Sequence, residues 1–237
     1  LAMMLLAAAP VEGEDFEGLP VVEITFSPPA QPVPQERLLE LLAVRVGAAL
    51  ESDQVRESIR KMFATGRYGD IRVDATRAGE GVRLTFITTD NWFIGPVRVV
   101  GVKEPPSADQ LINATKLELG ELYTEQKMEA AREALRRVLA ENGYYGAAIE
   151  AETQAHSDTQ QIDITFQVEP GERARFGEVR LQGKPDLSVE QVKRITGWGP
   201  EDRFTQPALQ RGLERLRRHY QKHDRLQAAV RVVEQSY

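Results

Sequence analysis

Apolar and polar side chains alternate with a period of two along two pairs of short segments in this chain. The first pair covers about residues 71–73 and 82–86, and the second covers about 145–154 and 162–168. Successive side chains of a strand point to opposite faces of its sheet. Each pair therefore predicts an antiparallel hairpin with one face buried under helices and the other face in solvent.

Three further segments have apolar positions at the i, i+3, i+4, i+7 spacing that is typical of a helix with one buried face. These positions are Val55, Ile59, Met62 and Phe63 in the first segment, Met128, Ala131, Leu135, Val138 and Leu139 in the second, and Leu209, Leu213, Leu216 and Tyr220 in the third. Ser52, Thr124 and Thr205 precede them and are predicted N-caps, because a hydroxyl oxygen can accept from the free N–H groups of the first turn.

A short strand and a first helix are expected ahead of each long helix. The predicted strands are Val21–Phe26, Val97–Val100 and Val179–Leu181. The predicted helices are about Gln35–Val44, Ala108–Thr115 and Val189–Thr196. Ser107 and Ser188 are each followed three residues later by Gln, which predicts a capping box at the start of the second and third of these helices.

The order of elements recurs because the sequence itself repeats. The stretch FIGPVRVVG at 93–101 returns as FGEVRLQG at 176–183, and GYYGAAI at 143–149 returns as DRLQAAV at 224–230, at a spacing of about 81 residues. A further copy lies upstream at a spacing of about 73 to 77. The difference of about four residues is close to one 3.6-residue helical turn, so the second helix of that copy is expected to be one turn shorter.

Three modules with the order strand, helix, helix, strand, strand are therefore predicted, at residues 21–91, 92–171 and 172–237. The expected fold class is α+β, with each module a three-stranded mixed sheet that carries two helices on one face. The third module stops before its last strand, so we expect the sequence to be a fragment of a longer protein. Residues 1–20 begin with the apolar run LAMMLLAAA and are expected to be a signal-peptide remnant or a disordered leader.

Composition narrows the possible functions. Hydrophobic residues make up 41% and charged residues 28%, which indicates ordered globular protein. A net charge of −6 argues against a broad nucleic-acid surface, since phosphate binding depends on Lys and Arg. The absence of cysteine excludes disulfides, thiolate metal sites and cysteine nucleophiles. No apolar run reaches the ~18–20 residues of a membrane-spanning helix.

The stretch VEPGERARFGEVRLQG at 168–183 resembles the junction between successive POTRA domains. In that family a valine followed three residues later by a glycine ends one module, and spaced apolar residues followed by a glycine start the next. The Gly-x-Tyr-Gly motifs at 66–69 and 143–146 resemble the turn of that family from second helix into hairpin. Ser27, Asp224 and Leu226 depart from the family pattern at equivalent turns. The resemblance covers about residues 20–237.

This resemblance implies a periplasmic arm of an outer-membrane β-barrel protein of the BamA/TamA superfamily, in a Gram-negative-type bacterium. The implied partners are unfolded outer-membrane proteins or subunits of an assembly complex, together with the protein's own C-terminal barrel, which this chain does not contain. No cofactor, metal or small-molecule substrate is expected, and no enzymatic activity. The clients and the branch of the superfamily stay open.

In POTRA-like modules the last strand is central, so the first hairpin strand lies at an edge, where free backbone groups can pair with an added strand. The expected edges are Asp70–Ala75, Ala147–Thr153 and Ala229–Val233. The candidate polypeptide-binding residues are Ile71, Arg72, Val73, Ala148, Ile149, Glu150, Ala151, Val230, Arg231 and Val232. Trp92, Phe93 and Phe176 lie at junctions and are candidates for packing between modules.

Other chemistry-bearing patterns have simpler interpretations. His219 and His223 have the i, i+4 spacing that can hold a metal, but two histidines without clear further ligands are typical of a solvated surface. The basic run 211–222 fits either a solvated helix face or contact with acidic lipid headgroups or a partner. No phosphate-binding loop, nucleophile elbow, metalloprotease or dinucleotide motif is present.

Two alternative functions stay open. An RNA-binding module of the KH type also carries Gly-x-x-Gly, although there the loop joins two helices and clamps the nucleic-acid backbone. A purely structural arm that docks lipoprotein or inner-membrane partners would share every feature of the sequence with a polypeptide-binding arm.

Overall fold

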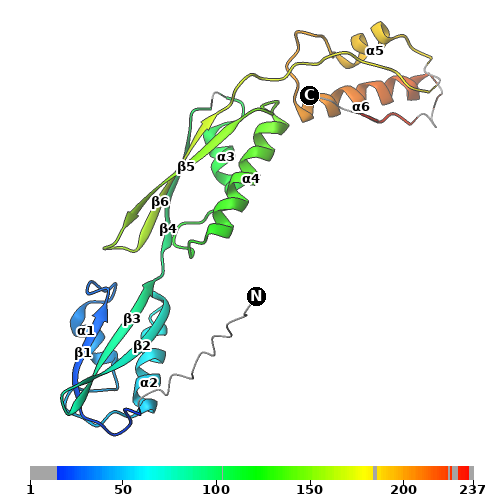
Figure 1. Cartoon of the computed structure of the whole chain (residues 1–237). Coiled ribbons are helices and arrows are strands. Elements are labelled where there is room, and N and C mark those ends of the chain that lie inside the picture. The colour runs from blue at the N-terminus through cyan, green and yellow to red at the C-terminus, as the bar shows by residue number, and fades with distance from the viewer. Residues whose placement is uncertain (1–14, 103, 184–185, 224, 226–228, 235–237) are drawn as a thin grey trace, which may run out of the picture. The chain divides into compact units, whose positions relative to one another are not determined.

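The computed structural model describes residues 15–102, 104–183, 186–223, 225 and 229–234 (Figure 1). Most of the expected leader at 1–20 therefore lies outside the described residues. The chain divides into two compact units, one made of the residues up to Trp92 with Ser157–Gln160, the other of Phe93–His156 with the residues from Gln161 onward. The division into three modules stays a prediction, and each unit is described by itself below.

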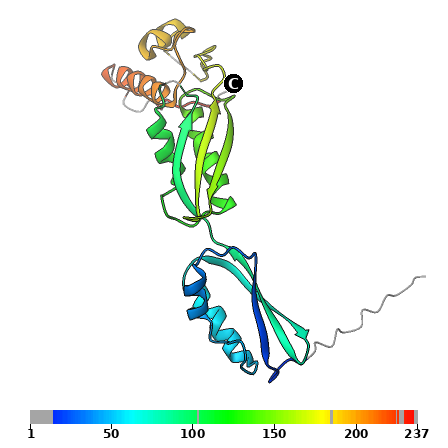
Figure 2. The ribbon, with the colours of Figure 1, turned by 90° about the vertical axis from the view of Figure 1, so that its left-hand side faces the viewer.

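Unit 1 contains one open sheet and two helices in the predicted order. The elements are β1 (Val21–Ser27), α1 (Gln35–Leu41), α2 (Ser52–Phe63), β2 (Tyr68–Ala78) and β3 (Gly81–Asp90). The strand order is β1-β3-β2, with β1 parallel and β2 antiparallel to β3. Both helices lie on the same face of this sheet (Figure 2). The predicted mixed α+β architecture and the central position of the last strand are confirmed for this unit.

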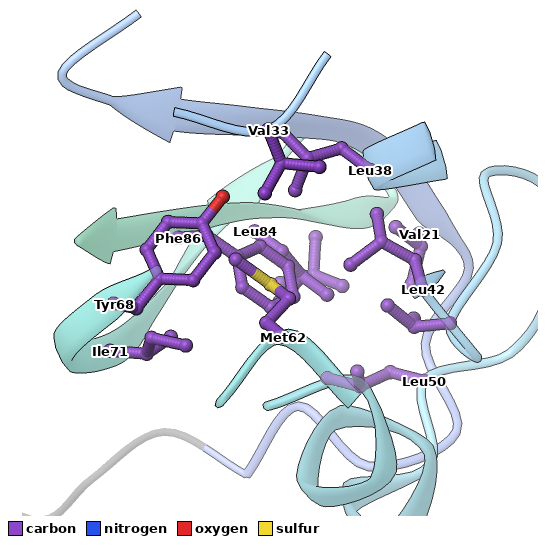
Figure 3. Packing of buried hydrophobic residues seen from close by; sticks show 12 residues of the cluster. Val21, Val33, Leu38, Leu42, Leu50, Met62, Tyr68, Ile71, Leu84 and Phe86 are labelled. Carbon is purple, nitrogen blue, oxygen red and sulfur yellow. The ribbon is translucent and has the colours of Figure 1, made fainter. Parts of the chain in front are cut away.

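The core of unit 1 forms between the central strand and the helices. Leu84 and Phe86 of β3 are at most 1% exposed, because alternate side chains of this strand point toward the helical layer. Met62 of α2 is fully buried and Leu38 of α1 nearly so, and they pack in the same cluster (Figure 3). The periodic apolar positions of the sequence thus meet in one hydrophobic core, which is the main force that holds the helices on the sheet.

The start of α2 differs from its prediction. The helix begins at Ser52, and Glu51 occupies the N-cap position without a side-chain hydrogen bond. Ser52 instead donates its backbone N–H and its hydroxyl to the carboxylate of Glu17, 35 residues earlier in the chain. A carboxylate near a helix N-terminus satisfies free N–H groups and complements the helix dipole. The prediction of Ser52 as N-cap was wrong because a distant acid took that role.

Unit 2 repeats the arrangement with β4 (Phe93–Val100), α3 (Ala108–Thr115), α4 (Glu125–Glu141), β5 (Ala148–His156) and β6 (Gln161–Glu169). Its strand order is β4-β6-β5, with β4 parallel and β5 antiparallel to β6. Ser107 forms the predicted capping box with Gln110, and Thr124 caps α4 by accepting from the N–H of Lys127. The local start signals of these two helices are therefore confirmed.

The remainder of unit 2 contains two helices and, among the residues that the structure describes, no strand. These helices are α5 (Val189–Thr196) and α6 (Gln206–Lys222). Ser188 forms the predicted capping box, and Thr205 is the predicted N-cap of α6. The predicted strands at Val179–Leu181 and at Val230–Val233 are wrong, because the described parts of both are irregular. A segment becomes a β-strand only when its backbone is hydrogen-bonded to a neighbouring strand. The described residues contain no central strand that could pair with these two segments.

Candidate functional site: the open strand edges

The first hairpin strand of each sheet lies at an edge. Among the residues that the structure describes, β2 is hydrogen-bonded only to β3, and β5 only to β6, in sheets whose central strands are β3 and β6. The candidate residues Ile71, Arg72 and Val73 belong to β2, and the run from Ala148 to Ala151 belongs to β5. In a one-sided antiparallel ladder, every second residue directs its backbone N–H and C=O away from the partner. Both strands therefore present a row of unpaired donors and acceptors.

The third group of candidate residues is not at any edge. Val230, Arg231 and Val232 lie in irregular structure, and the described residues around them form no sheet. Their side chains are half-buried or exposed. The prediction that these three residues form an open strand edge was wrong, because a segment outside a sheet has no regular row of backbone donors and acceptors.

The edge formed by β5 is regular over its whole length. Its register with β6 runs without a shift from Ala148 opposite Glu169 to His156 opposite Gln161. The strand has nine residues, none of them glycine or proline. At 3.4 Å per residue in an antiparallel strand, it offers a straight margin of roughly 27 Å. Such a margin is long enough to pair with several residues of an extended chain.

The edge formed by β2 is longer but irregular at its start. Its eleven residues include a register shift between Tyr68 and Asp70. Beside this shift, the side-chain amide of Asn91 donates to the carbonyl oxygens of Gly66 and Tyr68. The first residues of β2 are thus hydrogen-bonded to Asn91, the residue after β3. The regular margin of β2 begins at Asp70.

The opposite margins, formed by β1 and β4, are partly covered. The segment between the two helices bridges to the start of each opening strand, at Pro20 with Ala49 and at Phe93 with Leu122. In β4, a register shift between Ile94 and Val97 spans a proline at position 96, which has no N–H to donate. Bridges, bulges and prolines are the devices that blunt an exposed edge. β2 and β5 are consequently the more accessible margins.

The same bridge recurs before the third pair of helices. Arg175 pairs with Arg203, Phe176 N donates to Asp202 O, and Phe204 N donates to Ala174 O. This bridge corresponds to those at the start of the opening strand in both sheets, although no strand follows it here. The internal repeat of the sequence therefore extends to a tertiary contact that pattern analysis did not predict.

The three junction candidates lie in different surroundings. Trp92 and Phe93 are half-buried; Trp92 ends the first stretch of unit 1, and Phe93 is the first residue of unit 2. Phe176 is buried within unit 2, stacked on Trp198 at 5.5 Å with 14° between the ring planes and edge-on to Phe204 at 5.1 Å. Their role in packing between modules stays a prediction.

Sequence reasoning missed most of the aromatic cluster around Phe176. Trp198 and Phe204 belong to this cluster, and Tyr145 packs against it, with its ring 6.1 Å from that of Phe204. Tyr145 is the tyrosine of the Gly-x-Tyr-Gly motif at 143–146, interpreted only as a turn. The recurrence of an aromatic residue in that motif was the available signal. Its partners lie 53 and 59 residues later, beyond the reach of local periodicity.

The patterns that resemble chemistry do not assemble into a catalytic or metal site among the described residues. No group of three or more His, Cys, Asp or Glu in that part of the chain is arranged to hold a metal ion. The rings of His219 and His223 are 4.3 Å apart, and His223 Nδ1 lies 2.8 Å from the carbonyl oxygen of His219. The Gly-x-Tyr-Gly motifs lie between helix and strand, unlike the helix-to-helix loop of a KH domain.

Two buried polar atoms in unit 1 lack a hydrogen-bond partner among the described residues. They are the hydroxyl of Tyr68 and one carboxylate oxygen of Asp90, on residues that face each other across the β2–β3 ladder. Burial, with a smaller contribution from the Asp90 charge, raises the pKa of Tyr68 to about 12. Burial also raises the pKa of Asp90. Burying these two polar atoms without a hydrogen bond lowers the stability of unit 1 at the end of β3 and the start of β2.

The fold and the two open edges define a chain built from small mixed-sheet domains with two helices each. Residues 93–171 match the family model for POTRA, described as the surface antigen variable number repeat. The resemblance to POTRA domains drawn from the sequence is therefore confirmed for these residues. In the described residues, none of the helices combines the length and the apolar character needed to cross a membrane.

Curated relatives carry related names. The chain is 18% identical over 168 residues to the outer membrane protein assembly factor BamA of Nitratidesulfovibrio vulgaris, covering 71% of this chain and 21% of that protein. It is 21% identical over 196 residues to a putative outer membrane protein assembly factor of Treponema pallidum, covering 81% and 23%. The chain thus spans only about a fifth of the length of these relatives.

Solved structures of similar chains include the N-terminal domain of Omp85 from Thermosynechococcus elongatus. That structure has a TM-score of 0.36 and 20% sequence identity, and the match covers 85% of this chain and 86% of that chain.

Proposed function

We propose that this chain is the periplasmic arm of an outer-membrane protein assembly factor, and that it binds unfolded outer-membrane proteins or assembly-complex subunits by adding them as strands to its sheets. The POTRA domain at 93–171 and the names of the curated relatives support the first part. The open edges of β2 and β5 support the second. The proposed activity is non-catalytic.

The single observation that carries the binding mechanism is the unbroken margin of β5. An added strand would satisfy the free N–H and C=O groups of β5, just as β6 satisfies the groups on its other side. Main-chain pairing depends little on side-chain identity, which suits an arm that handles many different extended segments. The antiparallel ladder with β6 on the other side of β5 holds this margin in place.

A proline scan along Ala148–Thr153 tests the mechanism. Proline removes one backbone N–H, and consecutive residues of the strand direct that group alternately toward β6 and toward solvent. We expect an alternating result: at one set of positions proline lowers the melting temperature, and at the other set it leaves folding intact and weakens peptide binding about 2- to 10-fold, the value of one hydrogen bond.

The folded variants of this scan decide the outcome. Binding of an extended peptide is measured by fluorescence anisotropy, and folding by circular dichroism. A variant with proline outside the strand, at the exposed Ser157 of the following turn, is the matched control. Unchanged peptide affinity in every folded variant of β5 would exclude this edge as the binding site and would favour the structural docking arm.

A further inference from the structure

The open face of the sheet in unit 2 carries negative charge next to the β5 margin. Glu150 and Glu152 are exposed on the side of β5 that faces away from the helices, while Ile149 and Ala151 are half-buried on the other side. In the part of the chain that the structure describes, neither glutamate has an ion-pair or hydrogen-bond partner. Their charges are therefore available to a strand that pairs with β5.

Two basic side chains of the same sheet lie beside a different acid. Arg98 of β4 lies 4.0 Å from Asp163 of β6, and His156 at the end of β5 lies 3.6 Å from the same carboxylate. Asp163 pairs in register with Gln154, whereas Glu150 and Glu152 pair with Gln167 and Thr165. Neutral residues thus face both glutamates from the central strand.

The β2 edge of unit 1 has a different charge pattern. Asp70, Arg72 and Asp74 are exposed at alternate positions and therefore share one face of the strand. Arg72 Nε lies 3.3 Å from Asp70 Oδ2, so the two charges neutralise each other within the strand. The two open edges of the chain therefore differ in charge.

A strand added to β5 would place its own side chains directly beside these glutamates. Cross-strand neighbours have Cβ atoms about 4.5–5.5 Å apart, where opposite charges attract and like charges repel. On the other face, the added strand would meet Ile149 and Ala151, which favour apolar neighbours. The favoured guest therefore alternates between basic residues and apolar residues.

We propose that the β5 edge selects extended polypeptide segments that carry Lys or Arg at every second position with apolar residues between them. The selectivity rests on the proposed function, since it requires that β5 accept a strand. It assigns Glu150 and Glu152 as the specificity-determining residues, and the β2 edge, where Arg72 offsets one of the two aspartates, as the less selective of the two. Lys or Arg opposite both glutamates accounts for roughly a 2- to 30-fold gain in affinity, from two cross-strand pairs.

Three nine-residue peptides with the same apolar residues, and with Lys, Glu or Gln at the alternate positions, test this selectivity on the whole chain. Fluorescence anisotropy at low ionic strength should show the Lys peptide binding roughly 2- to 30-fold more tightly than a neutral Gln version. The Glu peptide should bind more weakly than the Gln version. The preference should decline as salt is added, because exposed charges are screened.

The double variant E150Q/E152Q separates the edge from the overall charge of the protein, which is −6. The matched control is E118Q/E141Q, which removes two exposed acids on other elements of unit 2 and changes the net charge equally. We expect E150Q/E152Q to abolish the preference for the Lys peptide and E118Q/E141Q to keep it.

The possible failures are distinguishable. Equal binding of the Lys and Glu peptides to the unmodified chain, or an undiminished preference in E150Q/E152Q, overturns the selectivity and leaves strand addition intact. Failure of all three peptides to bind overturns strand addition itself, and the selectivity with it. A preference that both double variants lose equally assigns the effect to net charge and also overturns the role of Glu150 and Glu152.

Discussion

The indole of Trp198 packs directly against Gly212 of α6, where a Cβ on residue 212 would come within 2.3 Å of Nε1. Trp198 follows α5 and is buried, so this contact joins the two helices of the last part of unit 2. The corresponding position in α4 is Ala131, which is fully buried. The glycine is therefore explained by its aromatic neighbour and not by the needs of a helix.

Gly212→Ala should destabilise this part of unit 2. Alanine favours the helix by about 1 kcal/mol over glycine, but overpacking against the indole costs typically 1–3 kcal/mol. We expect a net loss of stability of about 1 kcal/mol, measured by urea unfolding with tryptophan fluorescence as the probe. Gln210→Ala, at an exposed position of the same helix, is the control and should be close to neutral. A stabilised G212A would show that the indole moves aside without cost.

The two glycines of the motif at 143–146 should respond differently to alanine. Gly143 has a φ of +91°, and a Cβ there would lie 2.3 Å from the carbonyl oxygen of Phe204. Gly146 has no atom within 4 Å of such a Cβ and no positive φ. Backbone strain and the clash should make G143A destabilising by at least 1–2 kcal/mol, while G146A should change stability little. Thermal unfolding followed by near-ultraviolet circular dichroism measures both, and equal effects would contradict this account of the contact.

Asp90→Asn should stabilise unit 1 at neutral pH. The pKa of Asp90 is raised by burial, so the folded state disfavours its charged form. Sites with a raised carboxyl pKa lower stability when pH is above that pKa, and this cost disappears as pH falls below the unfolded value near 3.9. The gain in melting temperature of D90N over the unmodified chain should therefore be largest at pH 7 and vanish only below the unfolded value near 3.9. A gain that is independent of pH would assign the effect to packing.

Tyr68→Phe removes the buried hydroxyl that lacks a partner. Because that group is desolvated without a compensating hydrogen bond, its removal should leave stability at pH 7 unchanged or raise it by up to about 1 kcal/mol. Tyr68 has a pKa of about 12, so the unmodified fold should lose stability as pH rises from 10, where the unfolded tyrosine begins to ionise. The Phe variant should lack that part of the decline. A large loss of stability at pH 7 would reveal a partner for the hydroxyl.

Much of the fold was predictable because its signals are local. The capping boxes at Ser107 and Ser188 involve residues three positions apart, and both form as predicted. The helical and strand periods predicted which face of each element is buried, and Leu84, Phe86 and Met62 meet in the core accordingly. The central position of the last strand came from the family resemblance, since periodicity alone does not order strands within a sheet.

The failures concern contacts between distant residues. Ser52 was predicted to cap α2, yet the acid that binds its N–H is Glu17. Val230–Val233 has the alternation of a strand but forms none. Alternation predicts which side chains share a face, but it does not supply a neighbouring strand to pair with. The cluster of Phe176, Trp198 and Phe204 draws together residues with no shared period.

The sequence by itself determined the kind and order of the elements in the two sheets and their helical layers, most of the helix caps and the buried faces, since each depends on residues within a few turns of one another. Only the tertiary structure decided which strand margins stay open, that β4 is blunted while β5 is regular, and that Glu150 and Glu152, within the described part of the chain, stand beside an open margin without an ion-pair partner. These features depend on the register between strands and on bridges from remote loops. Such contacts form only when the chain has folded, and their geometry is set by packing between segments far apart in the sequence.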